Sequence, residues 1–372
     1  MTAQRRKKRT KHNETHSTEL TPRFSNVLVI RFSALGDVAL GIPVIYSLCT
    51  SNPGTRFIML TRPVAATIFI NTPPNLVVVA ADVKRKYSGL SGLLTLRKEL
   101  LRDYNIDACV DLQDEPRSWV LTSLLRLSGI PCKRLRKGRT GKHALTRKHN
   151  KRMFPLVSSR ARYREVFHRM GFSFEDSFES IYGVKGATGS PEDFASITTD
   201  KQPGETWVAI APFAKYKSKI YPLDQMETIV AEISSWEHTR VFLFGVGKDE
   251  KDVFGAWQQK YPNVTSLAET RHGFKCELSL LSHCDVMLSM DSVNMHLASL
   301  VRLPVVSIWG ATHPYCGFMG WQQKRSNAVQ LNMACRPCSV TGNKSCISGD
   351  YYCLRGISPQ LILSHIRTAL NS

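Results

Sequence analysis

The fold is decided by residues 26–48, which read NVLVIRFSALGDVALGIPVIYSL. An apolar run, Val27 to Ile30, ends at Arg31 and is followed by a turn at Gly36 and by a segment with helical spacing. The run does not alternate apolar with polar residues, which is typical of a strand covered on both faces. Asp37 opens the helical segment, where it fits either a structural N-cap or a catalytic carboxylate at a sheet edge. The stretch predicts a buried strand, a tight turn and a helix.

Apolar strands and amphipathic helices alternate along most of the remaining chain. Such alternation is typical of parallel sheets with helices on both faces, so we predict an α/β fold with doubly wound sheets. The predicted strands are residues 27–30, 56–60, 75–80, 106–112, 207–211, 240–244, 285–289 and 304–309. The predicted helices are residues 90–102, 117–127, 223–236, 292–300 and 358–370.

At 372 residues the chain is long for one core, and its composition divides it into parts. Residues 1–25 are polar and contain a run of Lys and Arg, which predicts a disordered basic tail. Residues 183–205 are rich in Gly, Ser, Thr and Pro, which indicates a boundary between domains. We therefore expect two domains, residues 26–185 and 206–357, which face each other across a cleft and are followed by a helix at 358–372.

The formal charge of +20 indicates a polyanionic partner, which on charge alone is nucleic acid, a phosphorylated glycolipid or an anionic membrane. Between residues 126 and 169, fifteen lysines and arginines stand against a single acid, Glu165. A merely soluble surface would mix the two signs, so we interpret this basic stretch as an anion-binding face of the first domain. Residues 137–142 within it have no apolar period and are expected to form a loop.

The sequence also favours a cellular location. No uncharged apolar run approaches the roughly 20 residues of a transmembrane helix, and residues 1–25 contain no apolar core of a signal peptide. We therefore expect a cytoplasmic protein and leave peripheral contact with the inner membrane open. Ten cysteines in such a protein are expected to be thiols or metal ligands, not disulfides.

Lysines and glycines follow two strands of the second domain. After the strand 207–211, lysines alternate at positions 215, 217 and 219, where they reach either a phosphate across the sheet edge or only solvent. Residues 244–247, Phe-Gly-Val-Gly, form a turn that lacks the third glycine of a dinucleotide-binding fingerprint. The glycine turn is therefore weak evidence for a ligand site.

A third place, residues 290–298, reads MDSVNMHLA directly after a predicted buried strand. Asp291 or Ser292 would cap the following helix, whose first N–H groups form a ready site for an anion. His296 lies further along the same helix, where it either donates a hydrogen bond to a phosphate or is simply packed.

Four motifs occur in order along the chain: Ser33 to Asp37, Lys219 to Pro222, Asp291 to Ala298, and WGATHP at Trp309 to Pro314. This arrangement resembles glycosyltransferase family 9, the lipopolysaccharide heptosyltransferases, from about residue 26 to the C-terminal helix. The resemblance implies a GT-B fold, with two Rossmann-like domains that bind the acceptor and the donor. It also implies an inverting, metal-independent glycosyltransferase that moves a sugar, typically heptose from ADP-heptose, onto a lipopolysaccharide core or a related anionic envelope glycan.

The resemblance also assigns roles to residues. The general base of the family falls on Asp37, which would take the proton of the acceptor hydroxyl. The donor diphosphate would be bound by a lysine and by the start of a helix, at Lys219, Asp291, Ser292, Val293 and His296. The implied partners are a nucleotide-sugar donor, a phosphorylated glycolipid acceptor and an anionic membrane surface, with no nucleic acid. No cofactor is implied beyond the donor.

The chain departs from the family pattern in places that leave the donor open. Val293 stands where most relatives have Gly, Tyr221 where they have Trp, and His313 where an acid often precedes the last Pro of its motif. A side chain at position 293 would crowd the approach of backbone to phosphate, although helical φ tolerates it. The identity of the donor sugar and of its nucleotide therefore stays open.

Four late cysteines form a separate cluster, at Cys335, Cys338, Cys346 and Cys353. The Cys-x-x-Cys start is that of a metal site, but the second half lacks a matching pair. Zinc or an iron–sulfur cluster, disulfides and free thiols all stay open, and a structural metal is not the expected outcome.

Two other functions are compatible with the sequence. The tail and the basic stretch suggest a nucleic-acid-binding protein, and Val293 suggests an inactive family member that acts as a scaffold. No helix-turn-helix, RNP or zinc-finger pattern occurs, and aromatic residues are not interleaved with the basic run as stacking platforms. Salt-sensitive RNA or DNA binding without nucleotide-sugar binding would favour the first alternative.

Overall fold

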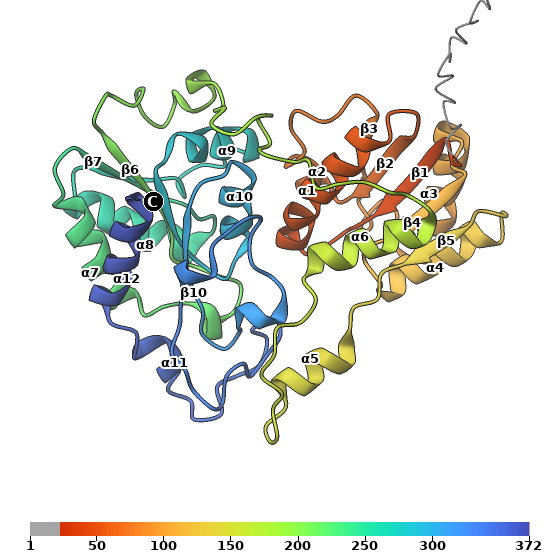
Figure 1. The fold of residues 1–372 in the computed structure, drawn as a ribbon. Coiled ribbons are helices and arrows are strands. Elements are labelled where there is room, and N and C mark those ends of the chain that lie inside the picture. The colour runs from red at the N-terminus through yellow and green to blue at the C-terminus, as the bar shows by residue number, and fades with distance from the viewer. Residues whose placement is uncertain (1–22, 372) are drawn as a thin grey trace, which may run out of the picture.

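The computed structural model describes residues 23–371 of the chain. The basic run between positions 5 and 11 lies outside the described residues. Within 23–371, the strands form two parallel sheets, one from each half of the chain (Figure 1). The predicted strands and helices are confirmed, with small shifts at their ends, because apolar runs and amphipathic periods are the strongest local signals in this chain.

The first sheet has the strand order β3-β2-β1-β4-β5, and all its pairs are parallel. The strands are β1 (Asn26–Ile30), β2 (Arg56–Thr61), β3 (Leu76–Ala80), β4 (Ala108–Asp111) and β5 (Cys132–Arg134). The helices of this half are α1 (Leu35–Ser51), α2 (Pro63–Ala66), α3 (Gly89–Tyr104), α4 (Pro116–Arg126), α5 (Arg139–Thr146) and α6 (Ser159–Met170). Val27 to Ile30 are fully buried at the centre of this sheet, as the unbroken apolar run predicts.

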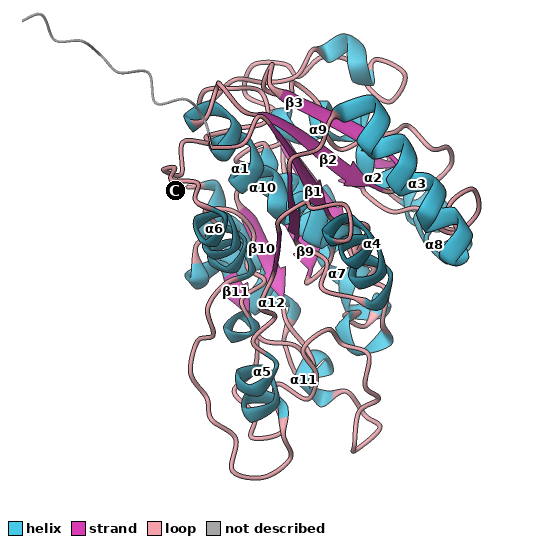
Figure 2. Cartoon of the chain, turned by 90° about the vertical axis from the view of Figure 1, so that its right-hand side faces the viewer, coloured by secondary structure: helices cyan, strands magenta, loops and turns pink. Residues whose placement is uncertain are grey.

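The second sheet has the order β11-β10-β9-β6-β7-β8, which is the Rossmann order with its crossover next to β6. The strands are β6 (Thr206–Ala211), β7 (Thr239–Leu243), β8 (Val264–Ser266), β9 (Val286–Met290), β10 (Val305–Ile308) and β11 (Ala328–Val329). The helices are α7 (Leu223–Ser234), α8 (Lys248–Lys260), α9 (Phe274–His283), α10 (Val293–Leu300), α11 (Tyr352–Arg355) and α12 (Pro359–Leu370). The sheets of both halves are seen in a second view in Figure 2.

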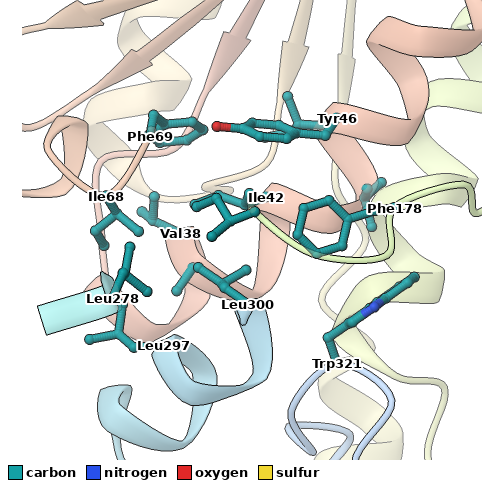
Figure 3. Packing of buried hydrophobic residues seen from close by; sticks show 14 of the residues in the cluster. Val38, Ile42, Tyr46, Ile68, Phe69, Phe178, Leu278, Leu297, Leu300 and Trp321 are labelled. Carbon is teal, nitrogen blue, oxygen red and sulfur yellow. The ribbon is translucent and has the colours of Figure 1, made fainter. Parts of the chain in front are cut away.

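Three apolar layers cover the two sheets. The outer layer of the first sheet contains the buried leucines of α3 and α4, and that of the second sheet contains the apolar faces of α7, α8 and α12. The inner layer is shared, because one continuous cluster includes Val38 and Ile42 of α1 together with Leu297 and Leu300 of α10 (Figure 3). Helices α1 and α10 therefore pack against each other and join the two domains.

The first described residues are attached to the first sheet, although the sequence places them in the tail. Phe24 packs on Phe172 with ring centroids 6.3 Å apart, and the amide of Ser25 donates to the Asp107 carboxylate at 2.6 Å. The backbone of Arg56 in turn donates to the carbonyl of Ser25 at 2.8 Å. Phe24 and Ser25 are therefore packed on the first sheet together with the residues that follow them.

Helix α5 corrects the prediction that residues 137–142 form a loop. It includes residues 139–146, and Leu145 is its fully buried apolar side chain, so no apolar period is visible in the sequence. Tertiary contacts hold it instead: the Lys142 ammonium lies 5.1 Å from the ring centroid of Phe318, and Gly141 faces Leu156. Packing between the domains therefore overrides a weak local helical signal.

The linker predicted at residues 183–205 includes an apolar anchor. A short 3₁₀ helix, Pro191–Phe194, buries Phe194 edge-on against Trp207 of β6, with ring centroids 6.0 Å apart.

In the described part of the chain, no helix combines the length and apolar character that crossing a bilayer requires.

Candidate active site

The end of β1 places Asp37 at the junction of the domains. Helix α1 begins at Leu35 and its N-cap is Ala34, so Asp37 is the third helical residue and not the N-cap that the sequence suggests. Its carboxylate reaches back to the amide of Ala34 at 3.4 Å. A carboxylate in the first turn interacts favourably with the helix dipole, so Asp37 stabilises α1 while one-quarter of its side chain stays exposed.

Arg31 holds the Asp37 carboxylate, a role that the sequence did not reveal. The two side chains form an ion pair at 2.5 Å, in which the arginine is almost fully buried. Arg31 also donates to the carbonyl of Leu112 and lies 5.8 Å from the ring centroid of Tyr163. The only visible signal is an arginine that ends a buried strand, since a charge there must find a partner.

The side chain of Gln113 holds the loop between β1 and α1 through hydrogen bonds. Its side-chain oxygen accepts from the amides of Phe32 and Ser33, both at 3.0 Å, and its amide nitrogen donates to the Ser33 hydroxyl at 3.1 Å. A buried glutamine that satisfies three groups of one loop fixes the path of that loop. Sequence reasoning missed Gln113 because its partners are distant in the chain.

In the second domain, Lys219 and Asp291 form a largely buried pair. The Lys219 ammonium lies 3.0 Å from the Asp291 carboxylate, which also accepts a hydrogen bond from the Thr312 hydroxyl at 2.7 Å. Lys215 and Lys217 are exposed, so of the three alternating lysines Lys219 alone turns inward. It belongs to a short 3₁₀ helix, Lys217–Lys219, that redirects its side chain.

Helix α10 begins next to this pair. Ser292 is its N-cap, as one of the two predictions has it, but the Ser292 side chain accepts no capping hydrogen bond and instead lies 3.4 Å from the Ser289 hydroxyl. Asp291 is not the cap, because its carboxylate is taken by Lys219 and Thr312. The first N–H groups of α10 are thus left without a capping side chain, which is the arrangement that binds anions.

His296 is buried within α10, with 7% of its surface exposed. Burial lowers its pKa to about 4, while the negative charges of Asp291 and Asp37 oppose that shift. Its Nδ1 atom has no hydrogen-bond partner. A buried ring nitrogen without a partner is costly, so the imidazole is a neutral group with capacity to bind a ligand atom.

The two motifs meet where α1 faces α10. A Cβ atom placed on Gly36 would lie 3.0 Å from Cδ2 of His296 and 3.7 Å from Cα of Val293. The missing side chain at Gly36 therefore lets the Asp37 turn touch the start of α10. Val293, the departure from the family pattern, packs its side chain into the shared apolar cluster. The structure thus brings together all of the predicted site residues, Asp37, Lys219, Asp291, Ser292, Val293 and His296.

Lys142 of α5 is a basic side chain that packs at the junction of the domains, where its ammonium lies 5.1 Å from the ring centroid of Phe318. Burial lowers the pKa of Lys142, and the negative charge of Asp37 opposes that shift. Helix α5 therefore brings one residue of the basic stretch into the surroundings of the candidate site. Others form ion pairs further away, such as Arg134 with Asp111 at 3.2 Å.

The buried Arg336 holds the loop that carries Thr312. Its guanidinium donates to the carbonyls of Trp309 and Thr312, both at 2.9 Å, and also to that of Gly310. These bonds orient the aromatic-Gly motif, and through Thr312 they support Asp291. The sequence did not point to Arg336, because it lies between Cys335 and Cys338, and this segment was interpreted only as a candidate metal site.

The glycine turn at residues 244–247 faces its own helix. Gly247 has φ of 147° and lies at the N-cap of α8, where a side chain would meet the carboxylate of Glu250. Its role is therefore to let α8 begin, and it adds nothing to the candidate site.

The four late cysteines are free thiols that line one small pocket, together with Met333 and Tyr351. Among residues 23–371, no group of three or more His, Cys, Asp or Glu side chains is placed to hold a metal ion. The same loop contacts the 3₁₀ helix that carries Lys219, because the Ser218 hydroxyl donates to the carbonyl of Gly342 at 2.6 Å. The loop of the four cysteines therefore packs behind the segment that carries Lys219.

Comparisons with known proteins identify the family of the chain. Residues 94–347 match the model of glycosyltransferase family 9 (heptosyltransferase). Lipooligosaccharide heptosyltransferase 2 of Campylobacter jejuni is 21% identical over 338 residues, which are 90% of this chain and 95% of that protein.

Solved structures share the fold. A family 9 glycosyltransferase of Veillonella parvula superposes with a TM-score of 0.70 at 15% identity, over 93% of this chain and 97% of that one. The E. coli heptosyltransferase WaaC with ADP-2-deoxy-2-fluoro heptose gives 0.64 at 16% identity, over 93% of this chain and 100% of that one. Two facing Rossmann-like domains of this kind are the GT-B fold, and the chain belongs to glycosyltransferase family 9.

Proposed function

We propose that the protein is an inverting heptosyltransferase that moves heptose from ADP-heptose onto a lipopolysaccharide core or a related anionic envelope glycan. The observation that carries the proposal is the contact between Gly36 and His296, since it sets a one-quarter-exposed carboxylate beside an anion-binding helix start. The family and the names of the relatives support the sugar and the acceptor class.

Asp37 acts as the general base in this proposal. It takes the proton of the acceptor hydroxyl while that oxygen forms a bond to the anomeric carbon of the donor. The bond from the anomeric carbon to the diphosphate oxygen breaks on the opposite face, so the configuration inverts. Arg31 keeps the carboxylate in one place, and alignment of this kind supplies much of the rate in reactions of two substrates.

The second domain stabilises the leaving nucleoside diphosphate. The free N–H groups at Ser292 and Val293 face the phosphate oxygens, and the partial positive charge of the helix start adds to them. Neutral His296 donates one further hydrogen bond. Lys219 supplies a full positive charge, which Asp291 neutralises until the diphosphate takes its place as the partner.

The division of labour between the halves is part of the proposal. Residues 26–185 bind the acceptor and residues 206–357 bind the donor, with residues 358–372 as a closing helix. The fifteen basic residues between 126 and 169 then match the phosphates of a glycolipid acceptor, and Lys142 is one whose charge interacts with that of the base. A membrane-anchored acceptor made in the cytoplasm requires the enzyme to act there, in peripheral contact with the inner membrane.

The transfer needs no cofactor besides the nucleotide sugar. The charges that a metal ion would supply at a diphosphate are supplied here by Lys219 and by the start of α10. Transfer that persists unchanged in excess EDTA supports this part of the proposal, and loss that Mg²⁺ restores contradicts it.

The test uses purified full-length protein, ADP-heptose and lipopolysaccharide truncated before its heptose region. Asp37→Asn keeps the shape and the amide contact but removes the base, so kcat should fall by about 10³-fold. Asp224→Asn is the matched control, because Asp224 is an exposed acid in the first turn of α7. Turnover retained in Asp37→Asn would overturn the base assignment, and wild-type protein that neither binds nor uses ADP-heptose would overturn the donor.

A further inference from the structure

We propose that the segment between α5 and α6, residues 147–157, is a docking surface for an anionic lipid bilayer. We call it the tip loop. The inference rests on the proposed function in one respect, since a glycolipid acceptor is embedded in a membrane. Its evidence is separate, because it comes from the exposure, the charge and the attachment of this loop.

The tip loop exposes large apolar side chains. Met153 is 47% exposed, Phe154 44% and Val157 57%, and Pro155 between them is exposed as well. These residues lie within five positions of one another on a single short segment of the chain. Large apolar side chains gathered in this way mark a surface that another apolar phase covers.

The same loop carries only positive charge. Arg147, Lys148, Lys151 and Arg152 belong to it, and it contains no aspartate or glutamate. Basic residues that flank apolar and aromatic ones match a bilayer with anionic headgroups, since the charges meet the headgroups while the apolar groups enter the acyl boundary. Aliphatic Met153 and Val157 offer no stacking platform, so the pattern favours lipid over nucleic acid.

The loop is held in position from the opposite domain. The amide of Leu156 donates to the carbonyl of Tyr315 at 2.9 Å, and that of Ser159 donates to the carbonyl of Gly317 at 3.0 Å. The ammonium of Lys151 donates to the carbonyl of Pro337 at 2.8 Å. Met153 and Phe154 lie between these attachments, so their exposure belongs to a fixed bend of the chain.

The place of the loop fits the route of a membrane-bound acceptor. It follows α5 directly, and α5 carries Lys142, which packs over the ring of Phe318 in the other domain. Burial lowers the pKa of Lys142, and the charge of Asp37 opposes that shift. In Figure 1, α5 and α11 both lie at the lower edge of the molecule, away from the two sheets. The second domain adds exposed Ile347 and Tyr352 from the loop before α11 and its first residue. An enzyme docked on this edge presents its candidate acceptor side to the bilayer.

The test measures binding of the full-length protein to sedimented vesicles of phosphatidylethanolamine with phosphatidylglycerol, and to vesicles of phosphatidylcholine alone. The wild type should bind the anionic vesicles and bind the neutral ones at least tenfold more weakly. Met153→Ser with Phe154→Ser should lower the partition coefficient roughly tenfold by removing buried apolar area. Lys148→Gln with Arg152→Gln should lower it roughly thirtyfold and reduce its dependence on salt.

Matched controls lie on the outer face of α3. Leu90 and Leu94 are 61% and 44% exposed, and Leu90→Ser with Leu94→Ser should leave vesicle binding unchanged. Lys98→Gln with Arg102→Gln is the corresponding control for charge. Thermal unfolding should show that every variant is folded. The substituted side chains are exposed, so their replacement should not disturb the core.

The outcomes separate this inference from the proposed function. The apolar tip variant should lose transfer to acceptor in vesicles but keep transfer to a deacylated, water-soluble acceptor. Tip variants that bind anionic vesicles like the wild type, or a wild type that binds RNA but no vesicles, overturn the docking surface and leave the transferase untouched. Vesicle binding through the tip loop without any sugar transfer overturns the proposed function and leaves the docking surface in place.

Discussion

The guanidinium of Arg31 lies 2.5 Å from the carboxylate of Asp37, and the arginine is buried while the acid is partly open to solvent. The pair therefore links the buried end of β1 to the partly exposed first turn of α1. Arg31 has further contacts with the Leu112 carbonyl and the Tyr163 ring, so the cation is fixed by three elements and the acid is fixed by the cation.

Arg31→Met should lower kcat by about 10²-fold while the KM for the donor stays nearly unchanged, because a carboxylate without its partner leaves the reactive geometry. The free energy of unfolding should also fall by about 1–3 kcal/mol, since the Leu112 carbonyl loses its donor. Steady-state kinetics and urea unfolding measure both. Arg102→Met is the control, as its pair with Asp103 is exposed; equal effects in the two variants would contradict the positioning role.

If Lys219 binds the donor as proposed, Lys219→Met should weaken ADP binding by roughly 10–100-fold, because it removes the positive charge of the Lys219–Asp291 pair and leaves Asp291 to repel the diphosphate. Calorimetric titration with ADP measures the loss. Lys215→Met is matched in residue type and loop but exposed, so it should bind ADP like the wild type. Equal affinity in Lys219→Met and the wild type would remove Lys219 from the donor site.

His296 should make the protein less stable in acid. Its folded pKa of about 4 lies below the usual value of 6.5, so between pH 6.5 and 4 the unfolded chain binds the extra proton. The free energy of unfolding should therefore fall as the pH falls through this window, by roughly 3 kcal/mol at its lower end. Urea unfolding at several pH values should show that His296→Gln flattens the slope.

His149→Gln is the control for that titration, since His149 is exposed in the tip loop. It should keep the wild-type slope. A slope that is the same in His296→Gln and the wild type would mean that acid destabilisation comes from other groups.

Gly36→Ala should disturb the junction of the two domains. The new Cβ atom would lie 3.0 Å from His296, so the imidazole or α1 must shift, whereas Gly41→Ala in the same helix makes an ordinary contact of 3.5 Å with Tyr163. We expect transfer to fall about tenfold or more in the first variant and to persist in the second. Full activity of Gly36→Ala would show that the close approach of α1 to α10 is not needed.

Much of the fold was predictable because its signals are local. Short unbroken apolar runs such as Val27 to Ile30, rich in β-branched residues and followed by a turn, favour covered strands, and the spacing after them favours helices. Helix α5 was missed since its one buried leucine gives no period, and its packing on Phe318 comes from the other domain. Long-range contacts of this kind leave no trace in a single sequence.

The sequence named residues that the structure brings close together, but it did not predict their arrangement. The order of the motifs indicated Asp37, Lys219 and Asp291 as candidate site residues. In the structure, however, α1 begins at Leu35, so Asp37 is its third residue and not its N-cap. Asp291 pairs with Lys219 and therefore does not cap α10. Arg31 and Arg336 were not predicted because most of their partners are backbone carbonyls far away in the chain, and because nothing in the sequence shows that Arg31 turns back to Asp37 six residues later. Such partners are set by tertiary packing and not by residue type.

The shared apolar layer between α1 and α10 also limits how the enzyme can move. Val38, Ile42, Leu297 and Leu300 belong to one continuous cluster, so separating the two helices would expose a core to water (Figure 3). Wide hinge opening is therefore costly, whereas sliding of one helix along the other keeps the layer covered. Substrates would then enter and leave when one domain slides past the other, and α1 and α10 would stay in contact during that motion.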